Sequence, residues 1–197
     1  MTYFGYLLVM TPLGVAITLW VIWAVSWLLA AVWSSRSHSS AGRIAQLPYR
    51  LIITAGYVLL FAVSPSQAFG HFFVLPQWGE WIMTALTAVG FAFTWWARLH
   101  LGKLWSPFVT RKDEHRIIET GPYRIVRHPI YTGVILASVT VAVLKGNLYA
   151  FTGAFLIGAG FWMKARLEER FLSEQLGPET YAGYRRRVPM LIPFFPP

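Results

Sequence analysis

Five apolar runs constrain the fold of this chain more than any other feature of its sequence. They cover residues 4–33, 51–75, 79–99, 130–144 and 147–163. A helix of about 20 residues crosses the ~30 Å hydrocarbon core of a bilayer, so the first three runs are long enough to span it. The last two are shorter, and Lys145-Gly146-Asn147 between them predicts a tight helical hairpin. The runs therefore predict an all-α integral membrane protein with about five transmembrane helices.

Composition supports one membrane domain. Of the 197 residues, 56% are hydrophobic and 13% are charged, whereas charged residues make up about a quarter of a soluble domain. We expect a single domain over residues 1–197, with three N-terminal spans over 1–99 on the substrate side and a cofactor-binding half over 100–197. The chain contains no cysteine, which excludes disulfides, thiol nucleophiles and thiolate metal ligands.

The basic residues predict the orientation of the chain. With five spans, the loops near Arg36 and Arg111 and the tail after Lys164 lie on one side, and only Lys145 and Glu80 lie on the other. The positive-inside rule then predicts an N-terminus outside and a C-terminus in the cytosol, at a bacterial inner membrane or at the endoplasmic reticulum of a eukaryote. Contact with anionic lipid headgroups explains the formal charge of +9, so nucleic acid is not an expected partner.

Two polar segments flank the predicted hairpin. Residues 106–128 form a long connector without a strong helical pattern, and connections of that length are commonly functional. After the last run, apolar residues recur at helical spacing over 164–176 and predict an amphipathic cytosolic helix. Gly177-Pro178 ends this helix, and residues 179–187 predict another short one before a proline-rich end.

The segment Arg127-His128-Pro129-Ile130-Tyr131 stands directly before the fourth run. Pro129 predicts the first residue of a helix, because its missing N–H would be unpaired there in any case. His128 then lies at the cap, and Tyr131 lies one turn inside. A helix N-terminus attracts anions through its free N–H groups and its partial positive charge. Arg127 and His128 strengthen that attraction, so the segment favours a carboxylate or phosphate ligand.

Glu168-Glu169 follows the fifth run. Ionisable groups at membrane depth usually face a cavity or a partner, and the hairpin brings this pair back beside the start of the fourth run. We therefore expect both carboxylates near Arg127 and His128, in a pocket with cationic and anionic halves that suits a zwitterionic cofactor or an amphiphile. A plainer interpretation stays open, with Arg127 as an interface anchor and the glutamates on a solvated helix face.

Two further patterns predict no ligand chemistry. Gly153, Gly158 and Gly160 lie inside the fifth run, which indicates close helix packing rather than a nucleotide-binding loop. The histidines show no metal-ligand spacing such as H-E-x-x-H, so the sequence predicts no metal site.

Three segments carry a resemblance when they are taken together. They are LGKLWS (101–106), HRIIETGPYRIVRHPIYTG (115–133) and EERFLSEQLGPETYAGYRRRVPMLIPF (168–194). In this order around a hairpin they closely resemble the isoprenylcysteine carboxyl methyltransferase family of integral membrane methyltransferases, which is similar to the phospholipid N-methyltransferases. The resemblance covers roughly residues 95–195. Its most specific element is R-H-P-x-Y followed by E-E, and the first two spans carry no family signal.

The resemblance implies a methyltransferase that uses S-adenosyl-L-methionine and releases S-adenosyl-L-homocysteine. The cofactor-binding residues that it implies are His115, Ile118, Gly121, Tyr123, His128, Pro129, Tyr131, Glu168 and Glu169. It also implies that Arg127 and one of the two glutamates orient the substrate carboxylate. The expected catalytic residues are therefore Arg127, Glu168 and Glu169.

The expected acceptor is a lipidic or prenylated small molecule that enters from the bilayer, with the carboxylate of an isoprenylcysteine-like molecule as the first choice. No obligate protein partner is indicated. N- or S-methylation of a phospholipid or another small amphiphile is the alternative. A more distant alternative is an NADPH-dependent membrane reductase of the sterol type, whose C-terminal region has a similar H-P-x-Y pattern.

Overall fold

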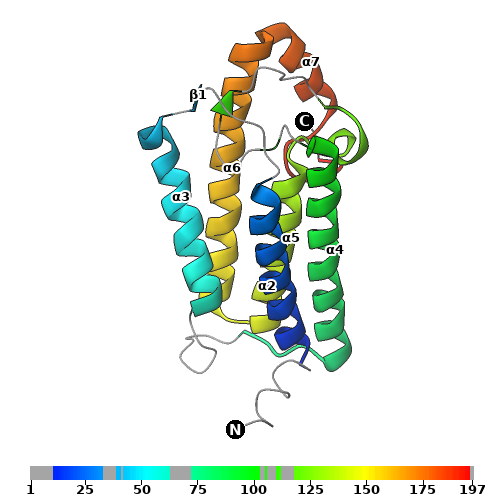
Figure 1. The fold of residues 1–197 in the computed structure, drawn as a ribbon. Helices are drawn as coiled ribbons and strands as arrows, with labels where there is room; N and C mark the ends of the chain where they lie inside the picture. The colour runs from blue at the N-terminus through cyan, green and yellow to red at the C-terminus, as the bar shows by residue number, and fades with distance from the viewer. Residues whose placement is uncertain are drawn as a thin grey trace.

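The chain folds into a bundle of helices that run in alternating directions (Figure 1). The computed structural model describes residues 11–32, 39–40, 42–62, 72–102, 105, 110–111 and 118–195. By length and composition, four helices in this part of the chain can cross a membrane, and Pro129–Lys145 is a further, shorter apolar helix. The predicted all-α, multi-pass membrane architecture is confirmed.

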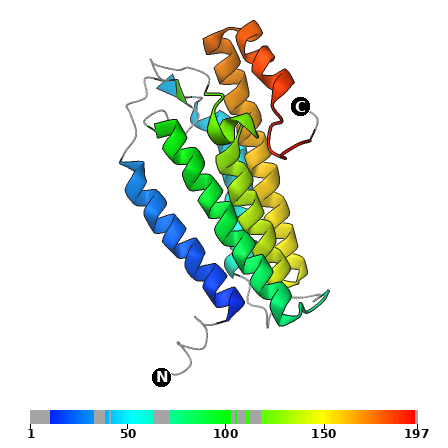
Figure 2. The same cartoon turned by 90° about the vertical axis from the view of Figure 1, so that its right-hand side faces the viewer.

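The long helices are α2 (Pro12–Ala31), α3 (Arg43–Tyr57), α4 (Gln77–Leu101), α5 (Pro129–Lys145) and α6 (Leu148–Leu176). The shorter elements are the π-helix η1 (Val58–Ala62), which continues α3, the 3-10 helix η4 (Gly121–Arg124), α7 (Pro178–Arg187), and the paired strands β1 (Ser39–Ser40) and β2 (Thr110–Arg111). α4 packs along α5, α3 packs along α6, and α2 lies against α4. Figure 2 shows α7 folded back beside the end of α6.

Two helices extend beyond the predicted apolar runs by more than two residues at one end. α3 begins at Arg43, in the polar stretch before residue 51, because polar residues can extend a helix beyond its apolar part. The helix predicted over 164–176 is confirmed and ends before Gly177 as expected; it continues the fifth apolar run without a break, as part of α6. Residues 161–176 contain no glycine or proline and are rich in good helix formers. Glu168 and Glu169 therefore belong to the same continuous helix as the fifth apolar run.

The predicted hairpin between α5 and α6 is confirmed. Gly146 ends α5 in the left-handed conformation, with a φ of 58°, which a residue without a Cβ adopts at no steric cost. Asn147 then caps α6, and its side-chain oxygen accepts a hydrogen bond from the Ala150 N–H at 3.0 Å. The tight turn sets α5 and α6 side by side along their length.

Facing glycines form the closest helix contacts. A Cβ placed on Gly90 of α4 would lie 2.7 Å from the carbonyl oxygen of Gly133 on α5. A Cβ placed on Gly153 of α6 would lie 2.7 Å from the carbonyl oxygen of Gly56 on α3. Small residues let backbones approach in this way, so these two contacts fix how α4 lies on α5 and how α3 lies on α6.

The glycines of the fifth run have two different environments. Gly153 and Gly160 both face α3 at distances that leave no room for a side chain, which confirms their predicted packing role. The same prediction is wrong for Gly158, because a Cβ there would meet no atom within 4 Å.

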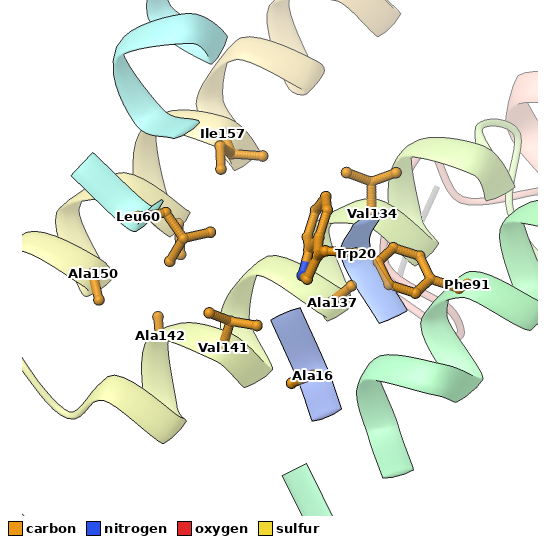
Figure 3. Close-up of a cluster of buried hydrophobic side chains, with 11 residues drawn as sticks. Ala16, Trp20, Leu60, Phe91, Val134, Ala137, Val141, Ala142, Ala150 and Ile157 are labelled. Carbon is orange, nitrogen blue, oxygen red and sulfur yellow. The ribbon is translucent and has the colours of Figure 1, made fainter. Parts of the chain in front are cut away.

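The core of the bundle gathers around Trp20 of α2 (Figure 3). Its ring meets those of Tyr57, Phe61 and Phe91 edge-on, with centroids 5.8, 5.2 and 4.9 Å away. The small side chain of Ala137 on α5 belongs to the same buried cluster. Aromatic contacts of this kind add to the burial of apolar area. Trp20 thus ties α2 to α3, α4 and α5.

The two ends of the bundle differ in charge. The start of α5, the end of α6 and all of α7 lie at one end, and α2 begins at the other. At that other end, the Lys145 ammonium donates to the carbonyl of Leu60 at 2.6 Å. Glu80 lies in the first turn of α4. The arrangement agrees with the predicted gathering of basic residues at one end. The side of the membrane that this end faces stays a prediction.

Candidate active site

The predicted meeting of Arg127 and His128 with Glu168 and Glu169 is present at the end of the bundle where α5 begins. The Arg127 Nε atom donates to Glu169 Oε1 at 2.7 Å. His128 Nε2 lies 3.2 Å from the same oxygen, and His128 Nδ1 lies 3.5 Å from Glu168 Oε2. The Tyr131 hydroxyl donates to Glu168 Oε1 at 2.6 Å. The α5–α6 hairpin therefore brings together two segments that are far apart in the sequence.

Glu169 and Arg127 form a buried pair that also holds the end of α7. Only 4% of Glu169 and 8% of Arg127 are exposed. The Arg127 Nη1 atom donates to the carbonyl of Arg185 at 3.2 Å and, at shorter range, to the carbonyl of Val188. The second Glu169 oxygen lies 3.5 Å from Arg185 Nε. Arg127 is thus occupied by groups of this chain.

Glu168 faces a different set of side chains. Besides Tyr131 and His128, it interacts electrostatically with Lys164, one turn earlier on α6. The Lys164 ammonium lies 5.1 Å from the centroid of the Tyr131 ring, where the negative face of the ring attracts it. The two neighbouring glutamates therefore point to opposite sides of His128, with Glu169 toward α7 and Glu168 toward Tyr131 and Lys164.

His128 bridges the two carboxylates. Its ring stacks on that of Tyr131, with centroids 5.4 Å apart, and Tyr131 stacks on Phe161 at 4.8 Å. Burial lowers the pKa of His128, but hydrogen bonds and charge interactions with Glu168 and Glu169 outweigh it and raise the pKa above the ordinary 6.5. The protonated ring, with a donor on each nitrogen, matches one acceptor on each side.

The segment after α7 lies against the start of α5. The N–H groups of Arg127 and His128 donate to the carbonyls of Pro189 and Met190 at 2.8 and 3.1 Å. The Thr132 hydroxyl donates to the carbonyl of Leu191 at 2.6 Å. Pro129 is the first residue of α5 and His128 is its N-cap, as predicted. The carbonyls of the proline-rich end were not foreseen there, because backbone acceptors leave no pattern in a sequence.

The predicted cofactor-enclosing loop is described from Ile118 onward, and His115 lies outside the described residues. Ile118 is half-buried. Gly121 has a φ of 57° and lies so close to the His100 ring that any side chain would collide with it. The Tyr123 hydroxyl points to the carbonyl of Ala97 at 3.5 Å, and its own carbonyl accepts from the Tyr184 hydroxyl at 2.7 Å. Tyr123 therefore joins α4 to α7.

An open pocket of about 600 Å³ lies beside Glu169. Its lining residues are Arg166, Glu169, Arg170, Ser173, Glu174 and Arg185. Side chains of both charges line it, as the sequence predicted, but they come from α6 and α7 rather than from the start of α5. Among the described residues, no group of three or more His, Cys, Asp or Glu side chains could hold a metal ion.

The sequence analysis missed Lys164 and two buried polar residues of α3, Gln46 and Tyr49. The sequence groups Lys164 with the basic residues of the tail. A continuous α6 places it one turn before Glu168 on the same helix, and its ammonium lies 5.9 Å from the Tyr49 ring. The spacing of Lys164 and Glu168 was therefore available as a signal, whereas nothing in the sequence linked α3 to this end of α6.

Residues 82–174, which run from α4 through Glu168-Glu169, match the model of the isoprenylcysteine carboxyl methyltransferase (ICMT) family. Over just under half of its length, the chain therefore resembles the ICMT family. The match contains the whole His128, Arg127, Tyr131 and glutamate cluster, and it leaves out α2, α3 and α7.

Curated proteins that are similar to this chain have several functions in their names. It is 32% identical to protein-S-isoprenylcysteine O-methyltransferase B of Arabidopsis thaliana over 56% of this chain and 51% of the relative. It is 29% identical to the cobalt-zinc-cadmium resistance protein CzcN of Cupriavidus metallidurans over 69% of this chain and 61% of the relative. It is 44% identical to methanethiol S-methyltransferase 2 of Bradyrhizobium diazoefficiens over 36% of this chain and 26% of the relative. The chain thus spans less than two thirds of each of these relatives.

Proposed function

We propose that this protein is a member of the ICMT family and a membrane-embedded, S-adenosyl-L-methionine-dependent methyltransferase that acts on a lipidic carboxylate. The observation that carries the proposal is the cluster in which His128 bridges Glu168 and Glu169 at one end of the bundle. The cluster lies within the family-matched residues. Buried charges at membrane depth mark functional sites, and two oppositely facing carboxylates provide separate places for a donor and an acceptor.

The donor set beside Glu169 fits a zwitterionic cofactor. The cofactor carries an ammonium, a carboxylate and a ribose diol, and the pocket beside Glu169 offers carboxylates, guanidinium groups and a hydroxyl. We assign Glu169, Arg185 and Ser173 to this side of the site, together with the predicted residues of the 115–123 loop. When bound, the cofactor supplies an electrophilic methyl group on a sulfonium.

The acceptor side is assigned to Glu168, Tyr131 and Lys164. A carboxylate acceptor forms its bond to the methyl group without losing a proton, so it needs no general base. The raised pKa of His128 agrees with this choice, because a protonated imidazole cannot accept a proton. His128 and Arg127 instead hold the two glutamates in place. Orientation of the reacting groups then supplies most of the rate advantage.

An S-methyltransferase is the second candidate, and one relative favours it. The match to methanethiol S-methyltransferase 2 has the highest identity of the three relatives above, over a short segment. A thiolate acceptor would also enter as an anion, and Lys164 would suit it as well as a carboxylate. The two candidates differ in the acceptor alone, so they share the cofactor assignment.

Calorimetry on the purified protein tests the reaction class. We expect binding of S-adenosyl-L-homocysteine and no binding of NADPH; the reverse result would identify a reductase instead. Glu169→Gln and His128→Ala should weaken the binding of S-adenosyl-L-homocysteine. The matched control is Arg124→Gln, which changes an exposed residue of η4. A methyl-transfer assay with an S-prenyl cysteine and with a small thiol then separates the two acceptors.

A further inference from the structure

Three apolar side chains are exposed together in the segment after α7. Ile192 is 61% exposed, Phe194 is 95% exposed and Phe195 is 62% exposed. They stand around a tight turn, in which the Phe195 N–H donates to the carbonyl of Ile192 at 3.3 Å. We call these three residues the apolar turn. Single exposed apolar residues are ordinary, whereas large apolar side chains that gather on a surface mark a contact with a partner or a membrane.

The backbone of Phe194 has a conformation that is costly for a bulky residue. Its φ is 63°, in the left-handed region where a Cβ crowds the backbone. The ring lies almost wholly outside the protein, so packing against this chain does little to offset the cost. Transfer of the ring from water into an apolar surrounding would offset it. The conformation therefore indicates that something outside the chain covers the ring.

The length of α5 places the apolar turn at membrane depth. The Leu191 carbonyl, directly before the turn, accepts from the Thr132 hydroxyl in the first turn of α5 at 2.6 Å. α5 has 17 residues, and its length of about 25 Å is less than the ~30 Å of the hydrocarbon core. The hairpin turn at its other end carries the charge of Lys145 and belongs at the opposite membrane face. The first turn of α5 therefore lies no farther out than the edge of the hydrocarbon core.

A tryptophan on α6 marks the same level. Trp162 is as far from Gly146 along the chain as Ile130 in the first turn of α5, so the hairpin sets the two at one height. The Trp162 side chain is 47% exposed, and the Arg166 guanidinium lies 5.2 Å from the centroid of its ring. Exposed tryptophans of membrane proteins gather where headgroups meet acyl chains. The level of the apolar turn is therefore this boundary.

The backbone before the apolar turn suits contact with lipid. The carbonyls of residues 188–191 all accept hydrogen bonds from residues 127–132. Pro189 and Pro193 have no N–H to leave unpaired. Backbone polar groups that face lipid need such partners within the protein, because the hydrocarbon offers none. The segment thus exposes apolar side chains while many of its polar groups are paired or absent.

The charges of α7 complement a lipid headgroup layer. α7 ends in three exposed arginines directly before this segment, Arg185, Arg186 and Arg187. Figure 2 shows α7 beyond the start of α5, with the chain returning from it toward the bundle. The guanidinium groups therefore lie farther out than the apolar turn, at the height of the headgroups, and a guanidinium group pairs well with a phosphate.

We propose that Ile192, Phe194 and Phe195 insert into the phospholipid leaflet where headgroups meet acyl chains, and that this contact holds the start of α5. The carbonyls of the same segment bind the N–H groups of Arg127 and His128. Lipid contact at the apolar turn therefore stabilises the backbone that carries the candidate site. The inference goes beyond the proposed function, because it depends on neither the methyl donor nor the acceptor.

Fluorescence quenching of the full chain in phosphatidylcholine nanodiscs tests the lipid contact. The chain contains no cysteine, so Phe195→Cys provides a single site for an environment-sensitive fluorophore and keeps Phe194. A nitroxide lipid labelled near its headgroup should quench this probe about twofold more strongly than one labelled near the end of its acyl chain, because the boundary lies nearer to the headgroup. Aqueous iodide should quench it weakly.

Two control positions calibrate the depth. Val21→Cys lies near the middle of α2 at a residue that is 57% exposed, and its probe should respond more to the nitroxide at the end of the acyl chain. Glu179→Cys lies in the exposed first turn of α7, and its probe should respond to iodide rather than to either lipid.

Two results would overturn the lipid contact. One is a Phe195→Cys probe that iodide quenches as strongly as the Glu179→Cys probe and that neither lipid quenches, since the turn would then lie in water. The other is a probe whose fluorescence rises when labelled protein is mixed with an excess of unlabelled protein. A second copy of the chain would then cover the turn.

Hydrogen exchange in the same nanodiscs tests whether the contact holds the start of α5. The double variant Ile192→Ser with Phe194→Ser changes exposed side chains alone, so the bundle should still fold. The amides of Arg127 and His128 should exchange about tenfold faster in it, since the burial of one apolar side chain is worth at least that factor. Val74→Ser, which changes an 88% exposed residue before α4, should leave their exchange unchanged. Equal exchange in the double variant and the wild type would overturn the link between the lipid contact and α5.

Discussion

The Nε atom of Arg127 lies 2.7 Å from Oε1 of Glu169, and both side chains are almost fully buried. Removal of one partner from such a pair leaves the other charge buried without compensation, at a cost of about 3 to 5 kcal/mol. Glu169→Gln should therefore lower the Tm of the purified protein clearly, before any effect on activity is considered. Thermal denaturation in detergent measures it.

The double variant Arg127→Met with Glu169→Leu separates charge from packing. It removes both charges and should recover part of the lost stability, although the carbonyls of Arg185 and Val188 lose their donor. Glu179→Gln, an exposed residue of α7, is the control. Equal Tm values for Glu169→Gln and Glu179→Gln would show that the buried pair contributes nothing to stability.

The pKa of His128 predicts how stability depends on pH. The pKa lies above 6.5 in the folded protein because the two glutamates outweigh burial. A group whose pKa is raised by folding contributes stability that is fully present below its unfolded pKa and is lost as pH rises through its folded pKa. We therefore expect the Tm to fall as pH rises above about 6.5.

His128→Gln should abolish this dependence and leave a flatter Tm profile over the same range. His100→Gln, which replaces an exposed histidine at the end of α4, should keep the wild-type profile. A His128→Gln variant whose Tm still falls with pH as steeply as the wild type would mean that another group titrates.

Two glycines of the bundle should respond oppositely to the same substitution. In Gly133→Ala the new methyl group collides with the Gly90 carbonyl and with Thr94, and overpacking of this kind costs about 1 to 3 kcal/mol. In Gly158→Ala it enters open space, and the higher helix propensity of alanine is worth up to about 1 kcal/mol. A Gly133→Ala protein as stable as Gly158→Ala would contradict the close α4–α5 contact.

The hairpin explains why half of the site could be predicted. Tyr131 and Phe161 are equally far from Gly146 along the chain, so a tight turn there brings them to the same level, and their rings stack at 4.8 Å. The same turn brings Glu168 and Glu169 to the end of the bundle where His128 lies. Turn chemistry and helical rise were sufficient because the two segments belong to consecutive helices.

The other half depends on contacts that carry no local pattern. α3 meets α6 where Gly56 faces Gly153, and two glycines in separate apolar runs do not reveal that they are partners. The position of Tyr49 over Lys164 follows from that contact. The partners of Arg127 beyond Glu169 are the backbone carbonyls of Arg185, in α7, and of Val188, directly after it. Every residue has such a carbonyl. Both features required the assembled bundle.

The orientation of the bundle can be measured directly because the chain contains no cysteine. Arg186→Cys places a thiol on the exposed surface of α7 at the end that holds the candidate site, and Gln77→Cys places one at the exposed start of α4, at the opposite end. A membrane-impermeant maleimide applied to intact cells should label Gln77→Cys at once. It should label Arg186→Cys only after permeabilisation, because the positive-inside rule assigns the basic end to the cytosol. The cysteine-free wild type controls for background, and the reverse labelling pattern would place the site on the outer face, away from the cytosolic pool of S-adenosyl-L-methionine.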